Sequence, residues 1–265
     1  MSFIVATFNC NSLRARMQVV TQWLKKRKPD VLCLQETKIQ NEIFPVEDFS
    51  KLGYQSVFSG QKSYNGVAVL SRYSIHDPKF GFGDGLDQED DLTRIIRCEI
   101  KGIFIINTYV PQGKSVLHDD FQRKLQWFKR LRKLFEREYR PDQKILWCGD
   151  LNVAPDPIDV HDPDLYTNHV CFHEKVRAAF KEVLDWGFID LLRKFHPEPG
   201  LYSFFDYRTP RAVKRNIGWR LDHILVTKPL ADIAQDAFID LEPRLWDRPS
   251  DHTFVVAKFD DAQLS

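Results

Sequence analysis

The sequence predicts a single domain of the α/β class, and three observations carry that prediction. Its 265 residues lie at the upper edge of what one compact domain holds. Apolar runs of strand length alternate, in both halves of the chain, with stretches whose apolar residues recur at helical spacing. No linker, low-complexity tract or tandem repeat interrupts residues 1–265, so we expect one domain over the whole chain.

The chain begins with two expected strands joined by a helix. Residues 3–8 form an apolar run, after which apolar residues recur at helical spacing. Ser12 stands at the N-cap position of this helix, and Pro29 is its stop signal. A second apolar strand, residues 31–34, ends in Gln35-Glu36-Thr37. Both strands therefore finish in polar side chains.

Antiparallel strands are expected in the middle of the chain, over residues 54–58, 66–71, 93–100 and 103–110. Residues 82–92 are acidic and rich in glycine, and we expect a solvated loop there rather than a metal site, because no strand fixes the carboxylates. A long amphipathic helix follows over residues 121–139. We expect its basic residues to form a solvated face rather than a DNA-binding patch: Arg123, Lys124, Lys129, Arg130, Arg132, Lys133 and Arg137.

The C-terminal half opens with an apolar run over residues 145–148, which ends in Gly149-Asp150-Leu151-Asn152. A helix that stops at Gly187 follows, and two more strands are expected from Gly218 and from Thr253. Between residues 202 and 217, four aromatic side chains interleave with four cationic ones. That composition suits contact with nucleic acid, and it equally suits an aromatic core beside a solvated turn.

Composition excludes several classes of protein. A formal net charge of +1 gives no overall attraction for a polyanion, so any contact with nucleic acid must be local. The five cysteines are widely spaced and form no zinc pattern, which predicts buried, reduced thiols. No stretch resembles a membrane span or a signal peptide, so we expect a cytoplasmic protein. The GxSxG, P-loop and GxGxxG motifs are absent from the sequence.

Polar side chains collect at the ends of the expected strands: Asn9, Asn11, Glu36, Tyr109, Asp150, Asn152, Asp222, Asp251 and His252. Because strand residues alternate faces, Asp150 and Asn152 can point the same way, although a simple turn would also explain this stretch. Oxygen-rich groups with little cysteine suit Mg²⁺ or Mn²⁺ better than zinc. A buried Asp222 needs a partner, and His252 is the one histidine with carboxylates available to orient its ring.

Six short blocks resemble, in the same order, the signature blocks of the exonuclease III family of apurinic/apyrimidinic endonucleases, within the endonuclease/exonuclease/phosphatase superfamily. They are FNCNSLRAR from residue 8, LQETK from 34, YVPQG from 109, GDLNVA from 149, GWRLD from 218 and PSDH from 249. Each block is weak evidence alone, but together they span nearly the whole chain. The resemblance implies a four-layer α/β sandwich of the DNase I-like kind, with two packed mixed sheets, helices outside and the site at one end of the sheets.

The same resemblance implies an activity in base excision repair. Members cleave the phosphodiester bond 5′ to an abasic site in double-stranded DNA, and many add 3′→5′ exonuclease and 3′-phosphodiesterase or phosphatase activity. We therefore expect a monomeric enzyme that uses Mg²⁺, with Mn²⁺ as the alternative, on duplexes with abasic or 3′-blocked lesions. Position 11 is Asn where some animal members have Asp, which removes one negative charge from the metal site.

By position, the resemblance also implies a metal site. Glu36 would be the principal ligand, Asn11 would lie close to the ion, and Asp251 would contribute directly or through water. Further candidate ligands are Asp150, Asn152 and His252.

Catalytic and substrate-binding roles follow from the same blocks. Asp150 would take the proton of the attacking water, with the His252–Asp222 pair as the alternative base. Three further side chains would contact that water or the phosphate: Asn9, Tyr109 and Asn152. Three others resemble the apolar pocket that receives a flipped-out abasic sugar: Phe204, Trp219 and Leu221. Because an abasic site lacks its base, flipping it out of the helix costs less free energy. Two are candidates for insertion into the DNA groove: Lys114 and Arg208.

Two competing hypotheses remain open at this point. The first is another phosphoesterase of the same superfamily, such as a nonspecific nuclease, an inositol-phosphate phosphatase or a sphingomyelinase. The QET, YVPQG and GWRLD blocks together favour the DNA-repair branch over it. The second is a non-catalytic nucleic-acid-binding protein that uses the aromatic and basic loop, for which Asp150 would be dispensable.

Overall fold

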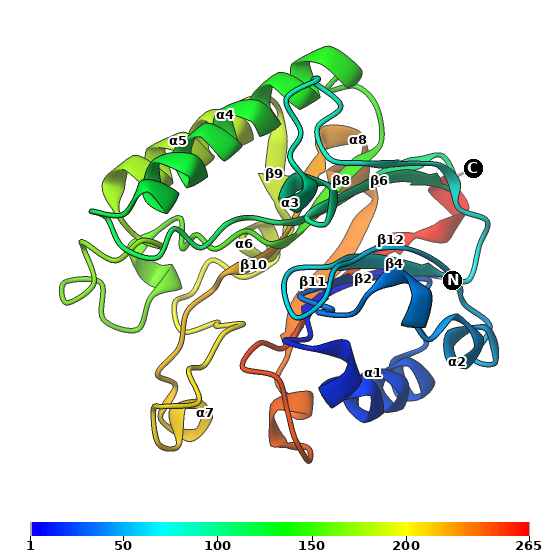
Figure 1. Cartoon of the computed structure of the whole chain (residues 1–265), viewed down its shortest axis with the longest axis horizontal. Helices are drawn as coiled ribbons and strands as arrows, with labels where there is room; N and C mark the ends of the chain where they lie inside the picture. The colour runs from blue at the N-terminus through cyan, green and yellow to red at the C-terminus, as the bar shows by residue number, and fades with distance from the viewer. Residues whose placement is uncertain (1, 265) are drawn as a thin grey trace.

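The computed structural model describes residues 2–264, which form two six-stranded mixed sheets packed face to face (Figure 1). Helices α1 (Leu13–Arg27) and α2 (Val46–Ser50) cover the outer face of the first sheet, and α4 (Asp119–Glu138) and α5 (Glu174–Leu184) cover that of the second. The two ends of the described chain lie together at one side of the molecule. This arrangement is the four-layer sandwich that was expected.

The first sheet has the strand order β11-β12-β1-β2-β4-β3. Its strands are β1 (Ser2–Asn9), β2 (Val31–Gln35), β3 (Gln55–Ser59), β4 (Val67–Ser71), β11 (Ala234–Asp240) and β12 (Phe254–Asp260). Since β1 and β2 are parallel and β12 is antiparallel to β1, the ends of β1 and β2 and the start of β12 meet at one edge.

The second sheet has the order β5-β6-β7-β8-β10-β9. Its strands are β5 (His76–Phe80), β6 (Ile95–Ile100), β7 (Ile103–Tyr109), β8 (Ile145–Asp150), β9 (Phe188–Asp190) and β10 (Asp222–Thr227). The parallel pair β7 and β8 places Tyr109 beside Asp150, and antiparallel β10 places Asp222 on the other side of Asp150. The hydrogen-bonding register alone therefore brings three of the predicted site residues together.

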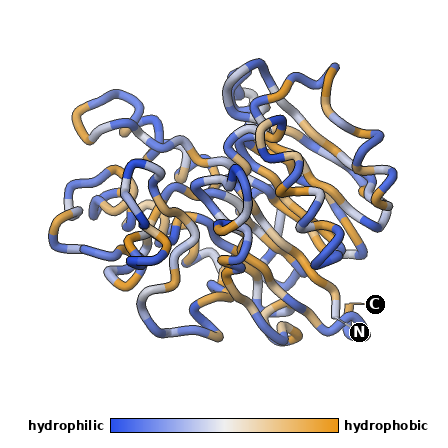
Figure 2. Tube along the Cα trace, turned by 90° about the horizontal axis from the view of Figure 1, so that it is seen from below, coloured by the Kyte–Doolittle hydropathy of each residue, from blue (hydrophilic) through white to orange (hydrophobic). Residues whose placement is uncertain are grey.

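Short elements complete the chain. They are α3 (Glu89–Leu92), α6 (Leu191–Phe195), α7 (Ala212–Arg215), α8 (Lys228–Ile233) and 3₁₀ turns at Asn41–Ile43, Pro157–Asp159, Glu242–Leu245 and Asp261–Gln263. Figure 2 shows that apolar residues follow the strands and that polar residues follow the loops. All five cysteines are buried and unpaired, which agrees with the expectation of buried, reduced thiols. Among residues 2–264, none of the helices has both the length and the apolar character needed to cross a membrane.

The expectation of a solvated acidic loop at residues 82–92 is only partly right: residues 82–88 form a loop with several exposed positions, but its carboxylates are not free in solvent. Part of this segment is the helix α3, and Asp91 is only 2% exposed. The Arg130 guanidinium of α4 lies 2.8 Å from carboxylate oxygens of Asp84 and Asp91 and 2.9 Å from one of Asp87. These ion pairs offset the free-energy cost of removing the carboxylates from water, and they hold the segment against α4.

The expectation of a solvated basic face on the long helix is also wrong for two residues. Lys124 is fully buried, and the side chain of Arg130 is 21% exposed. Helical spacing places both beside the apolar face, where loops cover them. Lys129 and Lys133 are exposed, as predicted.

Two smaller predictions also need correction, and three strands were not predicted. Ser12 stands at the N-cap of α1, but its side chain makes no capping hydrogen bond, because its backbone is left-handed and its N–H donates to the Glu36 carbonyl at 2.8 Å. Strands β5, β9 and β11 were not predicted; β5 is largely polar, and all of its positions are exposed. The strand expected from Gly218 begins only at Asp222; Trp219 makes isolated bridges to Val160 and Phe204 instead.

Candidate active site

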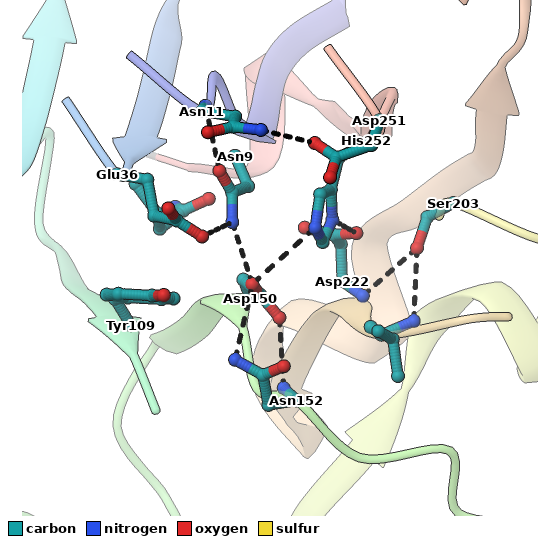
Figure 3. A network of polar contacts seen from close by, with 12 residues as sticks. Asn9, Asn11, Glu36, Tyr109, Asp150, Asn152, Ser203, Asp222, Asp251 and His252 are labelled. Carbon is teal, nitrogen blue, oxygen red and sulfur yellow. Dashed lines mark hydrogen bonds and ion pairs between the residues drawn. The ribbon is translucent and has the colours of Figure 1, made fainter. Parts of the chain in front are cut away.

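The polar strand ends of both sheets converge on one site (Figure 3). The first sheet supplies Asn9 from β1 and His252 from the segment before β12, while the second supplies Asp150 from β8 and Asp222 from β10. Direct contacts join the two sets: Asn9 Nδ2 donates to Asp150 Oδ2 at 2.8 Å, and His252 Nδ1 lies 2.7 Å from Asp222 Oδ2. The site therefore requires the two sheets to be packed correctly on each other.

Asp150 lies at the centre of this network and is 1% exposed. Its Oδ1 accepts the backbone N–H of Asn152 at 3.0 Å, and the Asn152 amide donates to its Oδ2 at 3.4 Å. Gly149 has a φ of +137°, and a Cβ there would collide with the carbonyl of Thr108. Only glycine therefore lets β8 run this close to β7 just before the carboxylate.

A buried histidine stands between two carboxylates. His252 Nε2 lies 3.8 Å from Asp150 Oδ2, on the opposite side of the ring from Asp222. Burial opposes protonation of the imidazole, but the nearby charges of Asp222 and Asp150 outweigh it and raise the pKa of His252. Burial also raises the pKa of Asp150, and the charges of Asp222 and Glu36 add to that effect. His252 therefore holds its proton more firmly than an isolated imidazole would.

The donors expected to hold a metal form a second part of the network. Asn11 Nδ2 donates to Asp251 Oδ1 at 3.0 Å, and Asn9 Nδ2 donates to Glu36 Oε1 at 2.9 Å. The Lys38 ammonium lies 2.7 Å from Glu36 Oε2 and 2.6 Å from Asn11 Oδ1. Burial opposes the ionisation of Glu36, but Lys38 and Asn9 outweigh it and lower the pKa of that carboxyl.

These oxygens fit a hard divalent cation. The side-chain oxygens of Glu36, Asn11 and Asp251 belong to the carboxylate and amide class that Mg²⁺ and Mn²⁺ prefer, and those of Glu36 and Asn11 already contact the ammonium cation of Lys38. Ligand atoms of Asp150, Asp222 and His252 also lie within 4.8 Å of one another, and Asp222 Oδ1 is buried with no hydrogen-bond partner among residues 2–264. Lys38 was missed by the sequence analysis, although it ends the LQETK block, because lysine is not a metal ligand.

Tyr109 enters the site as a neutral phenol. Burial and the nearby charges of Glu36 and Asp150 raise its pKa. The Arg94 guanidinium lies 4.6 Å from the centre of its ring and donates to its backbone carbonyl at 3.2 Å. Tyr109 is therefore oriented by Arg94 and keeps its proton, so it can donate a hydrogen bond to an anionic ligand.

A cavity of about 620 Å³ opens beside the network. Its lining includes four residues predicted to bind substrate: Phe204, Arg208, Trp219 and Leu221. The Phe204 ring lies 4.9 Å from the His252 imidazole, which connects the apolar wall to the polar centre. Lys114 is not among the lining residues; its side chain is 65% exposed and pairs with Asp120 at 2.7 Å.

One loop adds a wall to this cavity that the sequence did not indicate. The rings of His161, Tyr166 and His169 lie 6.4, 4.9 and 4.6 Å from the Trp219 ring. All three also line the cavity. Histidine and tyrosine in an irregular segment carry no periodic signal, so only the fold reveals that they meet Trp219.

Comparison with known protein families identifies the relatives of this chain. Residues 6–252 match the model described as the Endonuclease/Exonuclease/phosphatase family. The chain belongs to this family. The match begins in β1 and ends at His252, so it covers every element that supplies the polar network.

Individual members of the family agree with the more specific resemblance. Exodeoxyribonuclease III of Haemophilus influenzae is 36% identical over 271 residues, which cover 98% of this chain and 100% of that protein. A solved AP endonuclease from Archaeoglobus fulgidus is 50% identical with a TM-score of 0.94, covering 97% of this chain and 99% of that one. A 3′ phosphatase from Neisseria, bound to product DNA hairpin, is 36% identical with a TM-score of 0.91 at the same coverage. The predicted family, fold and enzymatic character are thereby confirmed.

Proposed function

We propose that this chain is a divalent-metal-dependent DNA-repair nuclease that cleaves the phosphodiester bond 5′ to abasic sites in duplex DNA. One observation carries the proposal: an oxygen-donor cluster and a buried His252–Asp222 pair meet at Asp150, beside a cavity walled by Phe204 and Trp219. We also propose 3′→5′ exonuclease and 3′-phosphodiesterase or phosphatase activity, because relatives named exodeoxyribonuclease III and 3′ phosphatase align over nearly the whole chain.

The same proposal extends to the setting in which the enzyme works. Residues 1–265 would act as one domain and as a monomer in the cytoplasm, on double-stranded DNA that carries abasic or 3′-blocked lesions. The proposed metal ligands are Glu36, Asn11 and Asp251. Bound Mg²⁺ or Mn²⁺ would supply positive charge to the phosphoryl oxygens, an effect worth several kcal/mol in the transition state.

The roles of the remaining groups follow from their surroundings. Asp150 is the proposed base, because burial brings its pKa upward, toward the range that suits a proton acceptor at neutral pH. His252 is held protonated by two carboxylates, so it would donate to a phosphate oxygen rather than remove a proton. Asn9 and Asn152 fix the orientation of Asp150, and the neutral Tyr109 phenol would donate to the phosphate.

The direct test uses duplex DNA that contains one stable abasic analogue. With Mg²⁺ present we expect a single nick 5′ to the analogue, and with EDTA we expect none. Matched intact and 3′-phosphate-blocked duplexes in the same assay separate the endonuclease, exonuclease and phosphatase activities. A protein that cuts intact and abasic duplexes equally, or that still cuts after the metal is removed, would contradict the proposal.

Preference for the lesion should depend on the apolar wall of the cavity. Replacing both Phe204 and Trp219 with Ala should weaken binding to abasic duplex by about 10-fold or more, since each lost aromatic contact is worth about 1–3 kcal/mol in comparable stacking sites. Binding to undamaged duplex should change much less, because the intact base remains stacked in the helix. Fluorescence anisotropy with the two duplexes measures both affinities, and equal losses would rule out this wall as the lesion pocket.

A further inference from the structure

Lys124 is a buried lysine that contacts three separate loops. It lies in the second turn of α4, and its side chain is fully buried. Its ammonium donates to the backbone carbonyls of Asn152 at 2.6 Å, Val170 at 2.8 Å and Gln112 at 3.0 Å. These three acceptors saturate the three donors of an ammonium group.

Among residues 2–264, no carboxylate lies at ion-pair distance from this charge. None of the salt bridges in the described part of the chain includes Lys124, and the acceptors are carbonyl dipoles. Burying an ionised group without a counter-ion costs free energy, whereas an apolar residue would suit this side of α4, which packs Phe121 and Phe128 into the core. Packing alone therefore does not explain why this position is a lysine.

Each of the three carbonyls belongs to a loop that lines the candidate active site. Asn152 has a left-handed backbone with a φ of +48°, and its amide also donates to the Val110 carbonyl at 2.9 Å. Gln112 lines the cavity just after the strand that carries Tyr109. Val170 lies between two cavity-lining residues, His169 and Cys171. A single ammonium thus connects the loops after β7 and β8 with the end of the loop that carries His161, Tyr166 and His169.

Further contacts show that this junction is tightly built. A Cβ added to Gly113 would lie 3.3 Å from Lys124 Cδ, so the first loop packs directly on the lysine stem. The Ala154 N–H donates to the Cys171 carbonyl at 2.7 Å, which joins the second and third loops beside the ammonium. A shift of the Lys124 head group would therefore move the Asn152 backbone with it.

We propose that Lys124 is a positioning residue for the reaction: its ammonium fixes the left-handed backbone of Asn152, and through it the orientation of the Asn152 amide against Asp150. This inference rests on the proposed function, since it assigns Asn152 to the catalytic centre. Lys124 itself is fully buried and is not among the residues that line the cavity, so it would act through Asn152. Its charge is needed because only three strong donors on one atom satisfy three loop carbonyls at a point that water does not reach.

The kinetic test replaces Lys124 with Met, which keeps the length of the stem and removes the donors. We expect kcat on abasic duplex to fall about 100-fold, because small displacements of a group at the reacting centre have effects of that order, while KM changes by less than about 3-fold. Lys129→Met is the matched control, since Lys129 is exposed on the same helix, and it should leave both constants unchanged. A Lys124→Met enzyme with wild-type kcat would overturn the proposal.

A double-mutant cycle distinguishes positioning from general destabilisation. If Lys124 acts through Asn152, adding Lys124→Met to Asn152→Ala should lower kcat by only a few-fold more, because the amide to be positioned is already gone. If the decrease in kcat of the double variant instead equals the product of the two single-variant decreases, Lys124 acts independently of Asn152 and the assignment is contradicted.

A measurement on the unaltered protein keeps the inference testable if Lys124→Met does not fold. Nitrogen-15 NMR should show one lysine ammonium whose protons exchange slowly with water, because all three are hydrogen-bonded away from solvent. Only fast-exchanging ammonium signals would exclude the buried arrangement. This result does not depend on DNA cleavage, so failure of the proposed function and failure of the Lys124 inference can be told apart.

Discussion

Replacing Asp150 with Asn should slow cleavage 5′ to an abasic site by about 10²–10⁴-fold, the range expected for loss of a general base. Asparagine matches aspartate in shape but cannot accept a proton from water. Its NH2 group also faces either the Asn9 amide or the Asn152 backbone N–H, each of which now donates to a carboxylate oxygen. Single-turnover assays on an abasic duplex with Mg²⁺ measure the loss directly.

Binding of the same duplex should be retained in this variant. Asp150 lines the cavity but is only 1% exposed, and removing its negative charge does not weaken attraction to a polyanion. Asp164→Asn is the control, because it makes the same chemical change on an exposed loop. Unaltered function in Asp150→Asn would support the non-catalytic binding hypothesis, whereas a strong loss of duplex binding would show that Asp150 acts in recognition rather than in proton transfer.

Much of the fold was predictable because its strands are short and apolar and end in polar residues. Val31–Gln35 and Ile145–Asp150 are buried at every position, so their sequences stand out as continuous apolar runs. Parallel pairing brings Asn9 close to Glu36 in the first sheet and Tyr109 beside Asp150 in the second, and the packing of the two sheets then joins Asn9 to Asp150. The arrangement of the sheets came from the resemblance of the six blocks, because no local pattern specifies which strands pair.

What the sequence could not indicate is long-range charge pairing. The Arg130 and Asp84 side chains are 46 positions apart, and both look like solvent-exposed residues in their own segments. Lys124 has the same local appearance as Lys129, and only the loops folded over α4 make one buried and the other exposed. Charged residues gain partners through tertiary structure, so a local pattern assigns them to the surface by default.

Arg220 is a further buried charged residue, and replacing it with Met should lower the free energy of unfolding by about 3–5 kcal/mol. This is the cost of leaving buried carboxylates without their cationic partner. Arg220 is 1% exposed; its Nε and Nη2 lie 2.6 and 3.0 Å from the Asp159 carboxylate, and its Nη1 lies 2.6 Å from Asp190 Oδ2. The same Nη1 lies 3.0 Å from His223 Nδ1. Urea denaturation of Arg220→Met followed by circular dichroism measures the change in the free energy of unfolding.

The Arg220→Met substitution should also destabilise the active-site loop that follows Asp150, because Arg220 contacts that loop through His223. Burial lowers the pKa of His223 to about 4, and Arg220 adds to that effect, so the ring is neutral at pH 7. Since Arg220 can only donate to Nδ1, the ring proton is on Nε2, which donates to the Val153 carbonyl at 2.9 Å. Arg220 thus stabilises the loop that follows Asp150. Arg140→Met is the control: its pair with Asp142 is 73% and 76% exposed, and its loss should cost less than about 1 kcal/mol.

The decrease in the free energy of unfolding caused by Arg220→Met should depend on pH, and the direction of this dependence tells charge pairing from packing. Burial opposes the ionisation of Asp159, but Arg220 and Arg193 outweigh it and lower the pKa of Asp159 to about 2. A carboxyl whose pKa is lower in the folded state stabilises the protein above its unfolded pKa of about 3.9, and that contribution disappears as the pH falls through the folded value. The difference in unfolding free energy between wild type and Arg220→Met should therefore narrow as the pH falls from about 5 toward 2. A difference that stays constant over this range would mean that Arg220 stabilises the fold by packing rather than by its charge.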